Sequence, residues 1–97
     1  MISLEDCQDF CGLTKEEVRA IAEHEQAPEI AASGLAMYLM YRDYGMERIR
    51  NMIVDNIRAG QLRGDKQRVR MLLHVLHHFL KTHPQARSEL YPWSANL

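Results

Sequence analysis

Histidines gather near the end of this chain. Four of its five histidines lie within ten residues of one another: His74, His77, His78 and His83. His74 and His78 are four residues apart, which places both imidazoles on one face of a helix, with His77 beside them. Two imidazoles at this spacing bind zinc, nickel or copper, whereas a structural zinc site needs four ligands. The same pattern is typical of a polar helix face in contact with water.

A second group of ionisable residues lies between positions 23 and 29, where Pro28 must interrupt a helix. His24 stands there between two glutamates. Glu25 continues the apolar stripe of the preceding helix, so we expect it to be buried. Glu29 opens the next helix, where the helix dipole by itself stabilises a carboxylate. If both glutamates point inward, they are candidates for metal ligands or proton carriers.

A metal site built from these two segments would combine Glu25, Glu29 and His24 with His74, His77 and His78. Such a mixture of carboxylates and imidazoles suits iron or zinc. However, the chain contains neither the Glu-x-x-His spacing of di-iron bundles nor the His-Glu-x-x-His spacing of zinc proteases. A shared site would require His77 to turn inward, or a second chain to supply its histidines. We therefore expect no cofactor, with iron or zinc as the alternative.

The chain lacks the groupings that usually identify an enzyme. No glycine-rich phosphate loop is present, and no serine or cysteine has a histidine and an acid at a recognisable spacing. Cys7 and Cys11 share a helix face but are too far apart for a Cys-x-x-Cys redox motif. We therefore assign no catalytic residue and expect a protein that is not an enzyme.

Length and composition favour one folded domain over residues 1–97. The 97 residues are 46% hydrophobic and 26% charged, which is typical of a globular chain. No run approaches the length of uncharged apolar sequence that spans a membrane, and the acidic N-terminus differs from the basic start of a secretory signal. We expect a cytoplasmic protein without a membrane partner, in which Cys7 and Cys11 are free thiols.

Charge is distributed unevenly along the chain. Residues 1–41 carry a net charge of −6 and residues 42–97 one of +5. A basic half is compatible with nucleic-acid binding. Nucleic acid is nevertheless not the expected partner, because aromatic residues do not interleave the arginines as they do in proteins that bind single strands. Acidic N-terminal helices are instead expected to face basic C-terminal helices, within one chain or across a dimer.

Capping residues, glycines and prolines divide the chain into helices. Ser3 begins a short first helix, and the capping box from Thr14 to Glu17 begins the second. Pro28 suits the first turn of the third, and Asp65 caps the fifth. The expected helices are residues 4–11, 15–26, 28–44, 46–59 and 66–82, followed by an irregular tail, residues 85–97. Gly45 and Gly60 are expected to end the third and the fourth helix. No strand pattern occurs, so the expected fold is an all-α compact bundle of five helices.

The third expected helix is apolar on every side. Leu35 and Leu39 lie on the face opposite Ile30 and Tyr41. A helix of this kind is either central in its bundle or shared with another chain. We therefore expect the third helix to be central, and we expect Leu35 and Leu39 to contact a second copy or another protein.

Asn56 interrupts the apolar stripe of the fourth expected helix. A buried amide without a partner costs about 1–3 kcal/mol, so Asn56 should be buried and hydrogen-bonded. Tyr38, Tyr41 and Glu25 are its candidate partners.

The segment from residue 18 to residue 32 contains Ala-Glu-His-Glu-x-x-Pro-Glu-Ile, and His83-Pro84 follows near the end of the chain. In these features residues 13–84 resemble a group of small bacterial proteins with an acid- and histidine-rich junction before a proline-started helix. The resemblance implies an all-helical, cytosolic bacterial protein and implies no activity. The primary hypothesis is a non-enzymatic, homodimeric protein–protein interaction module, and the alternative is a helical protein that binds iron or zinc.

Overall fold

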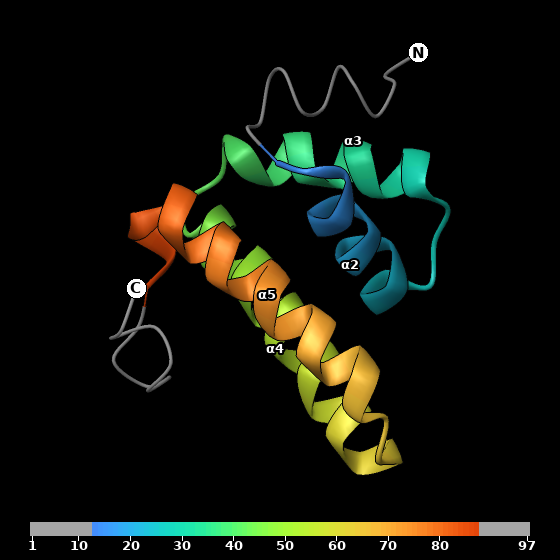
Figure 1. The fold of residues 1–97 in the computed structure, drawn as a ribbon. Helices are drawn as coiled ribbons and strands as arrows, with labels where there is room; N and C mark the ends of the chain where they lie inside the picture. The colour runs from blue at the N-terminus through green and yellow to red at the C-terminus, as the bar shows by residue number, and fades with distance from the viewer. Residues whose placement is uncertain (1–12, 88–97) are drawn as a thin grey trace.

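The computed structural model describes residues 13–87, which form four α-helices and one 3-10 turn. These elements are α2 (Lys15–Glu25), α3 (Glu29–Met40), α4 (Gly45–Arg63), α5 (Lys66–Thr82) and η1 (Pro84–Ala86). α4 and α5 run side by side as a long hairpin, and α3 packs near one end of it (Figure 1). α2 packs on both helices of the hairpin and contacts α5 from His78 to Arg68. The all-α prediction is confirmed for this part of the chain. The predicted first helix, both cysteines and most of the predicted tail lie outside the described residues.

The two predicted caps are present. The hydroxyl of Thr14 accepts a hydrogen bond from the backbone N–H of Glu17 at 3.2 Å, which satisfies a free amide at the start of α2. The carboxylate of Asp65 accepts one from the backbone N–H of Arg68 at 3.1 Å at the start of α5. α2 ends at Gln26, whose backbone is left-handed with φ 53° and whose N–H bonds back to the last turn.

Two glycines predicted to end helices do not do so. Gly45 is the first residue of α4, and the third helix stops earlier than predicted, at Met40. α4 continues through Gly60 and ends at Gly64, which has φ +72°. A Cβ atom on Gly60 would lie 2.9 Å from a methyl group of Val69, so this glycine lets α4 and α5 approach closely. Helix–helix packing, rather than a helix stop, explains Gly60.

α4, and not α3 as predicted, is the central helix. It packs against α2, α3, α5 and η1, whereas α3 packs mainly against α2 and α4. The core is built from apolar residues at helical spacing, with Ile49, Ile53 and Ile57 on α4 and Leu72, Leu76 and Phe79 on α5. α3 therefore keeps one side on the surface. Within residues 13–87, no helix has the length and apolar character that crossing a membrane requires.

Candidate functional site

His24, at the end of α2, lies between two carboxylates. Its Nδ1 atom is 2.8 Å from Oε2 of Glu25, and its Nε2 atom is 3.0 Å from Oδ2 of Asp55 on α4. The two ring nitrogens point in opposite directions, so these carboxylates flank the imidazole and cannot converge with it on one ion. Glu25 is exposed, which corrects the prediction that it is buried. It lies beyond the last buried turn of α2.

The other predicted metal ligands lie elsewhere. Glu29 forms an ion pair with Arg19 at 2.9 Å, and not with His24. His74 and His77 are exposed on α5, and His78 contacts α2. Within residues 13–87, no three histidine, cysteine or acidic side chains lie together in a group that could hold a metal ion. The fold therefore does not assemble the six predicted ligands into one site.

Glu17 is the fully buried carboxylate of the described chain. It lies in the first turn of α2, and its Oε1 atom is 3.1 Å from Nδ1 of His78 on α5. Its second oxygen, Oε2, is buried and has no hydrogen-bond partner within residues 13–87. Buried polar atoms are nearly always paired, so an unpaired carboxylate oxygen is unusual. Replacing Glu17 would therefore measure how a buried carboxylate affects the stability of the fold.

Burial raises the pKa of Glu17 above its ordinary value of 4.5. The hydrogen bond and charge of His78, the charge of His83 and a hydrogen bond from the backbone of Thr14 each lower this pKa, but they do not cancel the effect of burial. The carboxyl group can thus hold a proton under conditions in which an exposed glutamate is ionised. His78, whose side chain is half exposed, connects it to the surface.

The burial of Glu17 is indicated by its position in an apolar stripe, although the same residue also fits the capping box of α2. Leu13, Glu17 and Ile21 are four residues apart, so they share one face of the first turns of α2. Leu13 and Ile21 are fully buried, and Glu17 is buried between them. A glutamate three residues after a threonine is common at exposed helix starts, so the capping box alone accounts for Glu17 and does not predict its burial.

Asn56 is buried, as predicted, but its partner differs from the three candidates. Its side-chain amide donates a hydrogen bond to the backbone carbonyl of Ala20 at 2.8 Å, which joins α4 to α2. Arg50, on the same helix, was not singled out from the sequence. It donates a hydrogen bond at 2.6 Å to the carbonyl of Ala86 in η1. Two buried polar side chains of α4 therefore hold neighbouring elements through backbone carbonyls.

The flanking carboxylates should make His24 a pH-dependent contributor to stability. Burial lowers the pKa of His24, but the hydrogen bonds and charges of Asp55 and Glu25 outweigh burial, so this pKa is raised above 6.5. A raised folded-state pKa contributes stability that is present below pH 6.5 and is lost as the pH rises through the raised value. His24→Gln should therefore lower the free energy of unfolding by roughly 0.5–1 kcal/mol in acid and by much less in alkali.

Urea denaturation of wild type and His24→Gln below and well above pH 6.5 measures this difference. His77→Gln, at an exposed histidine of α5, is the control and should leave stability unchanged at both values. An equal loss for His24→Gln at both pH values would show that the carboxylates do not stabilise the charged imidazole.

The side of α3 that faces away from α2 and α4 forms what we call the α3 outer face, which consists of Ile30, Ala31, Gly34, Tyr38 and Tyr41. Its large side chains are strongly exposed: Ile30 by 46%, Tyr38 by 54% and Tyr41 by 75%. No charged residue occurs between positions 30 and 41. After Glu29, the exposed part of α3 is therefore uncharged as far as Tyr41, which is unusual for a helix surface in contact with water.

The predicted contact residues lie on the other side of α3. Leu39 is fully buried, and Leu35 is partly buried against the core. Leu39 is therefore a core residue and is not available to a partner, which corrects the prediction for it. An all-apolar helix gives no indication of which side is buried, so the two sides were exchanged.

Aromatic and basic side chains adjoin where α3 ends, contrary to the sequence argument that they do not. The guanidinium of Arg42 lies over the ring of Tyr38, 5.1 Å from its centre. Tyr41 and Tyr44, on either side of Arg42 in the sequence, are both exposed. Tyrosine and arginine are the residue types most enriched where protein interfaces concentrate their binding energy.

Comparison with known proteins gave no match: no family model fits the chain, and neither a curated protein nor a solved structure is significantly similar to it. The resemblance of residues 13–84 to small bacterial proteins stays a prediction. Functional conclusions for this chain therefore depend on its own residues and surfaces.

Proposed function

We propose that this protein is an interaction module of the cytoplasm that forms a homodimer through the α3 outer face. The observation that carries the proposal is the exposure of Ile30, Tyr38 and Tyr41 on a helix surface that has no charged residue between positions 30 and 41. Exposed apolar patches of this kind mark protein contacts in folded domains. Covering these side chains removes apolar area from water, which is the main favourable term in association.

Gly34 supports the proposal that a second helix covers the α3 outer face. A Cβ atom on this residue would have no neighbour within 4 Å, so the absent side chain serves no packing purpose within the described chain. In the middle of a helix, glycine is unfavourable by about 0.5–1 kcal/mol relative to alanine. The notch at Gly34 allows the backbone of another helix to approach closely, with Tyr38 beside it.

The charges at the two ends of α3 support an antiparallel arrangement. Glu29 lies at the start of the helix and Arg42 just after its end. A two-fold axis near the middle of α3 places Glu29 of one copy beside Arg42 of the other, and it places Ile30 beside Tyr41. The same contact made twice is the usual form of a symmetric dimer. α3 has 12 residues and is about 18 Å long, so the contact is small and association is expected at about micromolar concentration.

Tyr38→Glu is expected to weaken self-association by about tenfold or more, because a buried interface tyrosine is commonly worth 2 kcal/mol or more and the variant adds a charge. Ile30→Glu should have a similar effect. Both side chains are exposed in the single chain, so neither variant should unfold it. Sedimentation velocity over a concentration series measures the dissociation constant, and circular dichroism checks the fold.

Leu62→Glu provides the matched control, because Leu62 is 90% exposed but belongs to the far end of α4. This variant should associate like wild type. Leu39→Glu should unfold the chain instead of producing a folded monomer, since Leu39 is in the core. Unchanged association of both Tyr38→Glu and Ile30→Glu would rule out the α3 outer face as the contact.

A further inference from the structure

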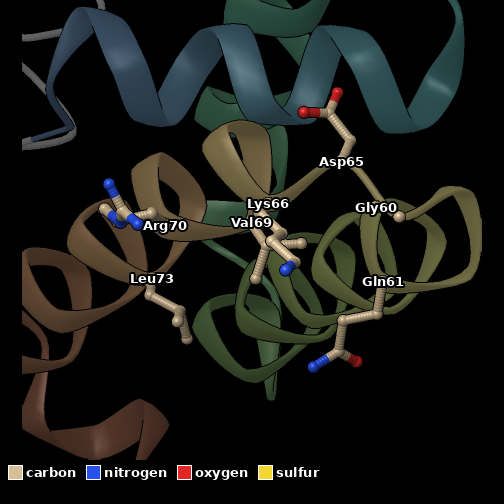
Figure 2. Close-up of a pocket in the computed structure, with 8 residues that line it drawn as sticks. Gly60, Gln61, Asp65, Lys66, Val69, Arg70 and Leu73 are labelled. Atoms are coloured by element: carbon tan, nitrogen blue, oxygen red, sulfur yellow. The ribbon is translucent and has the colours of Figure 1, made fainter.

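A second surface feature lies where α4 turns into α5, at the opposite end of the hairpin from α3 (Figure 1). A cleft of about 450 Å³ opens there between the end of α4 and the first turns of α5. Figure 2 shows Val69 and Leu73 on α5 along this cleft, with Gln61 on α4 beside them. Leu73 is 40% exposed, although it adjoins the buried Leu72 on the same helix. Its side chain serves the cleft more than the core.

Two glycines line the cleft. Gly64, at the turn, would have nothing within 4 Å of an added Cβ atom. At Gly60, the space of a side chain is taken by a methyl group of Val69, which holds the two helices close. The floor is therefore apolar and formed by closely packed helices, while the space above it is free.

The cleft continues along α5. A neighbouring cleft of about 420 Å³ is lined by Arg70, Leu73, His74 and His77, so the two hollows share Arg70 and Leu73. We call the combined feature the α5 groove. From Lys66 to His77 it follows twelve residues of helix, about 18 Å, which matches roughly three turns of another helix.

The charged side chains along the α5 groove are mainly positive. Lys66 and Arg70 form no ion pair with any other residue in the described range. Asp65 is the acidic residue of the lining, and its carboxylate is engaged with the backbone N–H of Arg68. The side chain of Arg68 pairs with Glu23 on α2. The groove thus combines an apolar floor with two cations that have no carboxylate partner within residues 13–87.

We infer that the α5 groove binds an acidic amphipathic helix of a partner protein. Apolar side chains on one side of that helix would cover Val69 and Leu73, and flanking carboxylates would pair with Lys66 and Arg70. Charge complementarity supports this occupant, because the two free cations lie beside the apolar floor. A nucleic-acid backbone does not fit as well, since its phosphates would have to cover an apolar floor. The groove and the α3 outer face are separate surfaces, so either can bind without the other.

Labelled synthetic peptides test the inference by fluorescence anisotropy. The probe is a helical peptide of about three turns with leucines on one side and glutamates flanking them. It should bind wild type with a dissociation constant of about 10–100 μM. Matched peptides with lysine in place of glutamate, or with alanine in place of leucine, should bind at least about tenfold more weakly.

Variants of the protein locate the binding. The double variant Lys66→Glu and Arg70→Glu should bind the acidic peptide about tenfold more weakly than wild type, or weaker still. This loss of affinity should be smaller at high salt. Leu73→Ser should weaken it by a similar factor, whereas Leu62→Ser, at an exposed leucine outside the groove, should not. Tyr38→Glu should bind like wild type, which separates this surface from the α3 outer face.

Equal binding of the acidic and basic peptides, or equal losses for Leu73→Ser and Leu62→Ser, would overturn the inference. Flotation with phosphatidylglycerol vesicles tests the competing occupant, an anionic lipid surface. Binding to these vesicles without binding to the acidic peptide would also contradict the inference, because it would assign the same cations to lipid headgroups.

Discussion

Gly45→Ala is expected to destabilise the fold by more than about 3 kcal/mol or to prevent folding, because the new methyl group has no space and meets backbone. Its Cβ atom would lie 2.6 Å from the carbonyl carbon of Leu39 and closer still to the oxygen. Neither group can move away as the end of a flexible side chain would, since Leu39 belongs to α3 and is fully buried. Urea denaturation followed by circular dichroism measures the loss.

Gly34→Ala is the matched control for this effect. Gly34 lies within α3, and an added Cβ atom there would have no neighbour within 4 Å. Alanine favours the helix, so this variant should raise the free energy of unfolding by about 0.5–1 kcal/mol when both proteins are measured below the concentration at which the proposed dimer forms. The same substitution should therefore have opposite signs at the two positions. A Gly45→Ala protein as stable as wild type would show that the corner between α3 and α4 is not packed as described.

The second large effect concerns Glu17. Glu17→Met should stabilise the fold by roughly 1–3 kcal/mol at neutral pH, because it replaces a buried carboxylate with an apolar side chain of similar length. The change also removes Oε2, which has no partner among the described residues. It sacrifices the contact between Oε1 and His78, but His78 is half exposed and can bond to water instead.

The gain from Glu17→Met should depend on pH in a defined direction. Because burial raises the pKa of Glu17, the contribution of this group to the stability of wild type is greatest below the ordinary value of 4.5, where it is protonated. This contribution is lost as the pH rises from 4.5 through the raised folded-state pKa. The variant cannot ionise, so its advantage over wild type should be small in acid and largest above this range.

Free energies of unfolding across a pH series measure the advantage, and Glu16→Met is the control. Glu16 is the exposed neighbour of Glu17 in the first turn of α2. Glu16→Met therefore removes the same charge as Glu17→Met, but from an exposed position. It should differ from wild type by no more than about 0.5 kcal/mol. If Glu17→Met were less stable than wild type at neutral pH, the pair between Glu17 and His78 would be a net stabilising contact.

Most helix starts could be predicted, because they depend on neighbouring residues. The roles of two glycines could not, because they depend on contacts between residues distant in the sequence. Thr14 and Asp65 cap α2 and α5 as predicted, because capping depends on residues three positions away. Gly45 and Gly60 were interpreted as helix ends, since glycine often ends a helix. In both cases a neighbouring helix, distant in the sequence, sets the requirement for glycine. Among the glycines of residues 13–87, only Gly64 has the left-handed backbone of a helix stop.

The candidate site was predicted less completely, for two physical reasons. The burial of Asn56 follows from the apolar stripe of α4, but its partner is a backbone carbonyl 36 positions away, which no side-chain pattern indicates. On α3, every side is apolar, so periodicity cannot distinguish the buried Leu39 from the exposed Tyr38. Glu17 and His78 are 61 positions apart in the sequence, and they meet because α2 packs on α5. The sequence alone does not predict that packing.

The measurement that tests the central claim most directly is sedimentation equilibrium of the wild-type chain and of Tyr38→Glu, from low to high micromolar concentration. The proposed dimer through the α3 outer face predicts that the wild-type mass rises from that of one chain toward that of two, while Tyr38→Glu stays near that of one. A wild-type mass of one chain over the whole range, or the same rise in both proteins, would contradict the proposed dimer.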